Sequence, residues 1–97
     1  VDVTGLGGGN QLVVKDSDIL NKACLNAVET SGVNANRYQL LVNGTGYDTV
    51  DLAGGTGTTG WTQSAQDLTY NDTTYHVWNS DTSLATLYIN SAITHVI

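Results

Sequence analysis

The fold is indicated most clearly by residues 67–79, which read DLTYNDTTYHVWN. Both halves of this stretch contain β-branched and aromatic residues, which favour strands. The second half, 74–79, alternates between two sets of side chains, and a period of two residues is that of a strand. Between the halves lie Asn71-Asp72-Thr73, and Asn and Asp accept the backbone conformations that turns require. The stretch therefore predicts a hairpin of strands 67–70 and 74–79.

The same signals recur along the rest of the chain. Residues 38–42 and 47–52 flank Asn43-Gly44-Thr45-Gly46, and Asn-Gly is the strongest short signal for a hairpin turn. Further strands are expected at 1–4, 11–15, 84–89 and 92–97. About seven short strands with turn signals every 8 to 12 residues are typical of a β-sandwich or barrel. We expect a mainly β fold, an antiparallel β-sandwich.

One short α-helix is expected near residues 17–29. Apolar residues recur there at spacings of three and four, which is the period of a helix. They are Ile19, Leu20, Ala23, Cys24, Ala27 and Val28. Asp16 or Ser17 can cap the start, and Gly32 follows the end, where glycine is common.

Composition limits what the chain can do. Ninety-seven residues predict a single domain, 1–97. Nine acidic residues against three basic ones give a net charge of −6, which excludes nucleic acid as a partner. No apolar run approaches the roughly 18 residues that cross a bilayer, so membrane insertion is not expected. The single Cys24 leaves no internal disulfide and is expected in the core. With Val1 first and no signal peptide, we expect an excised segment of a longer protein.

Three aspartates are candidate ligands for calcium, which prefers oxygen donors. Asp48 lies beside the Gly46 turn, and the alternative is an Asp that stabilises that turn. Asp16 and Asp18 are two residues apart and could reach one ion from a loop, although helix capping explains them as well. The remaining candidates are expected to be solvated aspartates, at positions Asp51, Asp72 and Asp81.

Other side chains could bind a ligand. Trp61, Trp78 and Tyr47 could form an aromatic platform for a glycan, with core packing as the alternative. His76 and His95 have no further ligand at zinc spacing, so they are expected to be ordinary strand histidines. No Gly-x-Ser-x-Gly elbow is present, and we expect no enzymatic activity.

An ordered series of short motifs spans residues 18–89. The motifs are Asp18-Ile19-Leu20, Leu40-Leu41-Val42-Asn43-Gly44, Gly46-Tyr47-Asp48-Thr49-Val50-Asp51-Leu52, Trp61, Thr74-Tyr75-His76-Val77-Trp78 and Ala85-Thr86-Leu87-Tyr88-Ile89. In order and spacing the series resembles a domain from the C-terminal region of large RTX adhesins of Gram-negative bacteria. Two features depart from that pattern: Asn71-Asp72-Thr73 replaces a glycine turn, and segment 21–39 is longer.

The resemblance implies a cell-surface, extracellular protein that a type I system secretes and that calcium rigidifies. We therefore expect a non-enzymatic structural or linking module of an adhesin, stabilised by calcium, whose partners are the neighbouring domains of the same polypeptide. The alternatives are a module that binds a surface glycan or peptide, and an accessory domain of a secreted hydrolase.

Overall fold

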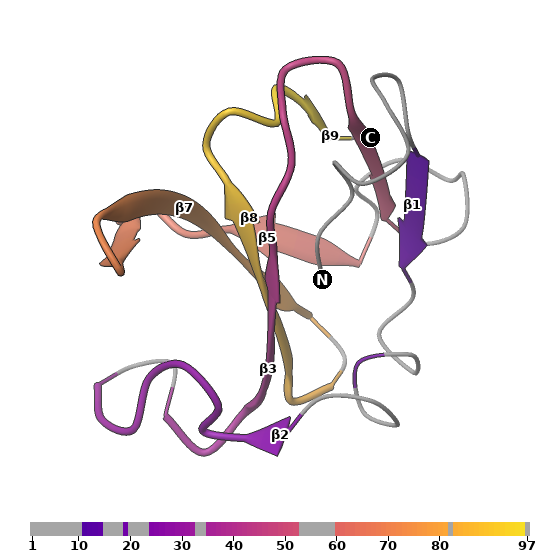
Figure 1. Ribbon diagram of the computed structural model, residues 1–97. Coiled ribbons are helices and arrows are strands. Elements are labelled where there is room, and N and C mark those ends of the chain that lie inside the picture. Colours follow the sequence, from indigo (N-terminus) through magenta and orange to yellow (C-terminus); the bar gives the residue numbers. More distant parts are fainter. Residues whose placement is uncertain are drawn as a thin grey trace.

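The computed structural model describes residues 11–14, 19, 24–32, 35–52, 60–81 and 83–96, and they form two β-sheets (Figure 1). The larger sheet has the order β2 (Cys24–Leu25), β3 (Tyr38–Val42), β8 (Ala85–Asn90), β7 (Thr73–Ser80) and β5 (Trp61–Gln63), with β6 (Leu68–Tyr70) also paired to β7. The smaller sheet has the order β1 (Gln11–Val14), β4 (Thr49–Leu52) and β9 (His95–Val96). No helix in the described part of the chain is long and apolar enough to cross a membrane.

The mainly β prediction is confirmed, and two sheets of several strands are compatible with a sandwich. Strand direction is more varied than expected. The β7 strand pairs antiparallel with β5, β6 and β8, but β3 runs parallel to β8. In the smaller sheet β4 runs parallel to both of its neighbours. The antiparallel arrangement therefore holds around β7 and at the β2–β3 pair, and the fold as a whole is mixed.

The hairpin predicted from residues 67–79 is present as β6 and β7. Tyr70 lies opposite Thr73, so the connecting loop has only two residues. These are Asn71 and Asp72, with φ angles of 51° and 62°. Positive φ at both central residues defines the type I′ turn, which matches the twist of paired strands. Asn-Asp thus replaces the more usual Asn-Gly in a turn that needs two left-handed residues.

The helix expected at 17–29 is not shown. Cys24 and Leu25 form β2, with Cys24 opposite Gln39, and Asn26 has a φ of 56°, which no right-handed helix contains. The Gln39 side chain provides the physical reason, because its Oε1 accepts hydrogen bonds from the backbone N–H groups of Val28 and Glu29, both at 2.7 Å. Ile19 is helical, while 17–18 and 20–23 lie outside the described residues, as does the strand expected at 1–4.

The hairpin expected at 38–52 is also wrong. Strands β3 and β4 belong to different sheets, so the chain between them crosses from one sheet to the other. Neither Asn43 nor Gly44 has the positive φ of a type I′ turn. The Asn43 Oδ1 instead accepts hydrogen bonds from the Tyr75 hydroxyl at 2.7 Å and from the Asn90 Nδ2 at 3.3 Å. These bonds tie Asn43, just after β3, to β7 and to the last residue of β8.

The core has two parts, one on each face of β8. The first packs between the two sheets and contains Val14, Ile19, Val42, Val50, Leu52, Trp61, Ala85, Leu87, Ile89 and Ile93. The second lies on the other face of the larger sheet and contains Tyr75, Val77 and Tyr88. β8 supplies residues to both, because successive side chains of a strand point to opposite faces.

Segment 21–39, which the resemblance marks as long, closes one end of the larger sheet where it is described. Arg37, the only arginine of the chain, reaches across to β8 and to the connection before it. Its Nε donates to the Thr86 Oγ1 at 2.6 Å, and its Nη2 lies 2.9 Å from the Ala85 carbonyl, 3.0 Å from that of Ser83 and 3.4 Å from that of Ser80. A single guanidinium therefore joins the start of β3 to the β7–β8 turn.

Candidate functional site

A pocket of about 360 Å³ opens between the larger sheet and the connection from β8 to β9. Its apolar lining consists of Trp78, Ile93 and Val96. Its polar lining consists of Gln63, His76, Ser91 and Thr94. The volume falls in the lower part of the range of about 300 to 1,000 Å³ found for small-molecule sites.

One wall of the pocket stands on paired strands. Gln63 of β5 lies directly opposite Trp78 of β7, so the two side chains are neighbours on one face. His76 precedes Trp78 by two residues on the same strand and shares that face. Three lining residues are therefore placed by the sheet ladder itself, which is more rigid than a loop.

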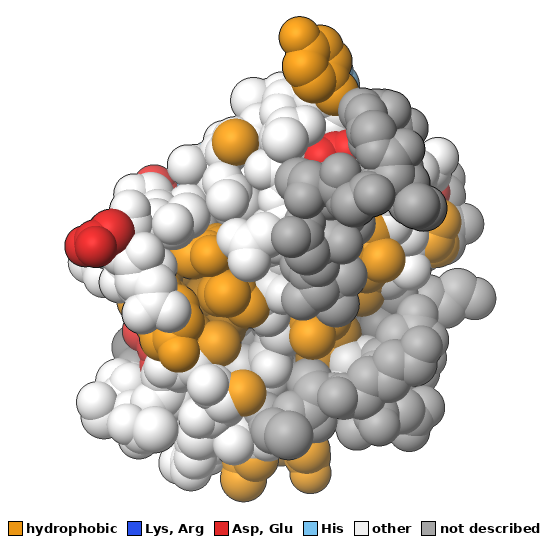
Figure 2. All heavy atoms as spheres, in the orientation of Figure 1, with side chains coloured by type: hydrophobic (Ala, Val, Ile, Leu, Met, Phe, Trp, Pro, Cys, Tyr) orange, Lys and Arg blue, Asp and Glu red, His pale blue; other side chains and the backbone are white. Residues whose placement is uncertain are grey.

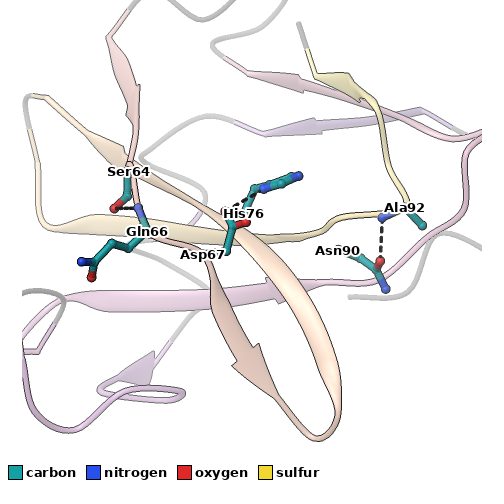
Figure 3. Close-up of polar contacts among 6 residues, drawn as sticks. All are labelled: Ser64, Gln66, Asp67, His76, Asn90 and Ala92. Atoms are coloured by element: carbon teal, nitrogen blue, oxygen red, sulfur yellow. Dashed lines mark hydrogen bonds and ion pairs between the residues drawn. The ribbon is translucent and has the colours of Figure 1, made fainter.

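An acidic partner orients His76. Its Nδ1 lies 2.8 Å from the Asp67 Oδ1, and the other ring nitrogen points away from Asp67 (Figure 3). Asp67 follows a tight turn in which the Ser64 backbone N–H donates to the Val77 carbonyl at 2.8 Å and the Ser64 Oγ accepts from the Gln66 N–H at 3.2 Å. A carboxylate at Nδ1 keeps the proton there, which leaves Nε2 of a neutral ring as an acceptor.

The opposite wall, 91–94, is fixed by local hydrogen bonds. The Ala92 N–H donates to the Asn90 Oδ1 at 2.9 Å (Figure 3), and the Ile93 N–H donates to the Asn90 carbonyl at 2.9 Å. The Ser91 N–H donates to the Thr74 carbonyl at 3.0 Å, which ties this turn to β7. Ile93 is buried in the core between the sheets. Both walls of the pocket are thus formed before any ligand arrives.

The three aromatic residues predicted as ligand contacts have different surroundings. Trp61 is only 7% exposed and packs in the core, which is the alternative given for it above. Trp78 lines the pocket, and its buried Nε1 has no hydrogen-bond partner in the described part of the chain. Tyr47 is 80% exposed in the crossing between the sheets. That crossing passes near the pocket, because a Cβ at Gly46 would lie 3.6 Å from the Ala92 carbonyl oxygen.

The Asp48 carboxylate serves the turn before β4. Its Oδ2 accepts hydrogen bonds from the Thr45 backbone N–H at 2.8 Å and from the Thr45 hydroxyl at 3.0 Å, and the residue is fully buried. Calcium takes six to eight oxygen ligands. No group of three His, Cys, Asp or Glu side chains that could hold a metal occurs among the described residues. As placed, Asp48 fits a turn better than an ion. Asp16 and Asp18 lie outside the described residues, so calcium binding there stays a prediction.

The other titratable candidates lie apart from one another. His95 is exposed on β9, and Asp72 and Asp81 are exposed as expected. The prediction that Asp51 is solvated is wrong, since the residue is only 5% exposed. Its Oδ2 lies 3.4 Å from the Gln11 Nε2. An alternating pattern on a returning strand predicted exposure, but β4 is the central strand of its sheet.

Tyr88 is a further buried polar group, on the face of β8 away from the pocket. Its hydroxyl donates to the Glu29 Oε2 at 2.7 Å. Burial, and then the bond to the Glu29 carboxylate, raise the pKa of the Tyr88 hydroxyl well above its usual range. This group stays protonated in the folded protein and fastens segment 24–32 to the sheet.

Nothing in the sequence singles out Gln63, Ser91 and Thr94 of the pocket lining, or Asp67 behind His76. None belongs to a motif, and only the β5–β7 register and the 91–94 turn bring them together. Comparison with protein-family models, with curated proteins and with solved structures gives no match for this chain.

Proposed function

We propose that this chain is a non-enzymatic structural module of an extracellular, cell-surface adhesin, and that it carries tension between neighbouring domains of the same polypeptide. The observation behind the proposal is the placement of the first and last strands that are described. β1 and β9 flank β4 in one sheet and run parallel to each other (Figure 1).

This placement determines how a pulling force would act. Tension toward the N-terminus draws β1 backward along the common strand axis, and tension toward the C-terminus draws β9 forward along that axis, in the opposite direction. Both strands must then slide along β4, so the bonds of each ladder are loaded together rather than one after another. Parallel ladders have evenly spaced bonds, which suits them to share such a load.

The middle strand is well anchored for this task. Val50 and Leu52 of β4 are fully buried in the core between the sheets. Four residue pairs join β1 to β4, but only two join β4 to β9. We therefore expect β9 to separate first when the ends are pulled.

The ordered motif series from Asp18 to Ile89 supports the adhesin context. In such a protein the module is one of several domains in series, and it transmits force to its neighbours without altering a substrate. The amide- and hydroxyl-rich composition, with 12% charged residues, suits an outer surface. In the view of Figure 2, Asp and Glu side chains are scattered and no Lys or Arg of the described residues is visible.

Single-molecule force spectroscopy tests the proposal. The chain is placed in tandem with a reference domain and stretched through its ends, because forced unfolding reports the unfolding barrier rather than equilibrium stability. The variant H95P/V96P removes both N–H donors of β9, including the one that faces β4. We expect it to lower the unfolding force of this module clearly.

The matched control is Val77→Ala, which removes two methyl groups from the second part of the core, away from the smaller sheet. It should lower the melting temperature but leave the unfolding force nearly unchanged. If V77A reduced the force as much as H95P/V96P does, resistance would simply follow global stability. The tension-bearing role would then be wrong.

A further inference from the structure

We propose that the pocket between β7 and the β8–β9 connection binds a neutral pyranose sugar unit. This inference does not rest on the load-bearing role, since six of the seven pocket residues lie on β5, β7 and segment 91–94, and only Val96 belongs to a loaded strand, β9. The loaded ladders are those of β4 with β1 and β9.

The lining has the mixed character that a sugar ring requires. A pyranose has apolar C–H faces and a rim of hydroxyl groups that both donate and accept hydrogen bonds. In the pocket Trp78, Ile93 and Val96 offer apolar surface. Four side chains around them offer neutral donors and acceptors: Gln63, His76, Ser91 and Thr94. A compact pocket of about 360 Å³ suits one ring better than an extended peptide.

Trp78 contributes ring carbon to this surface. Its Nε1 is buried and out of reach of solvent, so the accessible part of the indole is apolar. An aromatic ring of this kind packs against the C–H face of a sugar through the hydrophobic effect and the negative face of its π-system. The backbone of Trp78 is fixed by pairing with Gln63 on one side and Leu87 on the other.

Charge restricts the ligand to neutral sugars. Among the described lining residues there is no Asp, Glu, Lys or Arg, so these residues offer an acidic sugar no cationic partner. Asp67 lies behind His76, and the whole chain carries a net charge of −6. Both features repel a carboxylate or sulfate group on the ligand.

The Asp67–His76 pair fixes the direction in which the His76 ring can hydrogen-bond to a ligand. Because Asp67 accepts at Nδ1, the ring is held in one orientation and presents Nε2 on its far side (Figure 3). Gln63 and Thr94 are exposed at the rim, one on each wall. A ring resting on the apolar floor could therefore bond polar groups from both walls. Because these walls are already ordered, little conformational entropy is lost on binding.

Binding is tested by titrating the ¹⁵N-labelled chain with methyl glucoside, methyl galactoside and methyl mannoside, and with methyl glucuronide as the acidic counterpart. The Trp78 indole N–H signal should shift in a saturable way with at least one neutral sugar, and much less with the glucuronide. We expect a dissociation constant on the order of 1 mM for a single ring, given the low affinity per atom of small ligands.

Two pairs of variants test whether the sugar binds in this pocket. Gln63→Ala and Thr94→Ala should each weaken binding about five- to tenfold, the loss expected for one hydrogen bond. The controls Gln66→Ala and Thr69→Ala make the same chemical changes at exposed positions outside the lining and should leave binding unchanged. All four sites are exposed, so folding should survive, which the dispersion of the NMR spectrum confirms.

Three outcomes would overturn the inference. The first is no saturable shift of Trp78 with any neutral sugar at 100 times the expected dissociation constant, about 0.1 M. The second is equal weakening by the lining variants and their controls. The third is saturable binding of short apolar peptides in place of sugars, which would make the pocket a peptide site.

Discussion

Replacing Arg37 by Met is the most informative test of how the start of β3 is held to the β7–β8 turn. Methionine keeps the length and apolar stem of the side chain but removes every donor. In the folded protein the guanidinium contacts Thr86, Ala85 and Ser83 at 2.6 to 3.0 Å, with Ser80 more distant at 3.4 Å. The three shorter bonds carry the interaction, because one Nη2 has only two protons to share among the carbonyls.

The expected loss of unfolding free energy follows from these bonds. A hydrogen bond from a charged donor contributes about 1.5 to 3 kcal/mol, and a neutral one about 1 kcal/mol. Thr86 is fully buried, so its lost bond should count in full. The Ser83 carbonyl belongs to a partly exposed turn where water can replace the guanidinium. We therefore expect Arg37→Met to lower the free energy of unfolding by about 2 to 4 kcal/mol. For a chain of this size that lowers the melting temperature by roughly 10 to 25 °C.

Urea and thermal denaturation followed by circular dichroism measure this change. Thr86→Val and the double variant R37M/T86V complete a cycle that isolates the Arg37–Thr86 term, for which we expect a coupling of about 1 to 2 kcal/mol. Arg37→Lys serves as the control for charge alone, and it should recover less than half of the loss because an ammonium cannot reach all three acceptors. A loss under about 0.5 kcal/mol for Arg37→Met, the range of ordinary surface substitutions, would refute the reasoning.

Two further predictions concern buried acidic groups. The raised pKa of Tyr88 means that its contribution to stability is fully present below about pH 10, the ordinary pKa of tyrosine, and is lost as the pH rises above it. Tyr88→Phe should cost about 1 to 2 kcal/mol at neutral pH and flatten the alkaline decline, and an unchanged decline in urea denaturation would contradict this. Asp48→Ala should cost about 1 to 3 kcal/mol through the two Thr45 bonds. That cost, measured by thermal melting, should be equal with calcium and with a chelator, and a loss seen only with calcium would assign Asp48 to a metal.

Local sequence signals were sufficient where a strand pairs with its neighbour in the sequence. The β6–β7 hairpin depends on a two-residue turn and on strands adjacent in sequence, and both are visible in residues 67–79. The strand at 84–89 was also recognisable, although its burial on both faces was not. Alternation shows that a strand has two faces, and it does not show whether a second layer covers each of them.

The same kind of signal failed where a local interaction competes with a distant one. Asn43-Gly44 is a strong turn signal, but Tyr75 and Asn90 bond the Asn43 side chain from other strands. The helical spacing near Cys24 is real in the sequence, yet Gln39 and β3 provide the partners for that backbone. In each case tertiary contacts outweigh a preference worth at most about 1 kcal/mol per residue.

The pocket depends on contacts that no linear pattern contains. Its residue type makes Trp78 a candidate, whereas the sequence predicts an ordinary strand histidine at His76. Gln63 and Thr94 carry no signal at all, because a glutamine or threonine is common on any exposed strand or turn. They become part of a site only through the pairing of β5 with β7 and the path of the chain from β8 to β9.

The sequence by itself determined that this protein is mainly β, that residues 67–79 form a hairpin and that its net charge is −6. These properties depend on side-chain chemistry and on neighbours within a few residues. Only the tertiary structure decided that β1 and β9 lie parallel on both sides of β4, and that two walls meet at Trp78. Such pairings join residues up to 84 positions apart, as Gln11 and His95 are joined through Thr49. Their energy comes from burying the shared core, which no single segment can do alone.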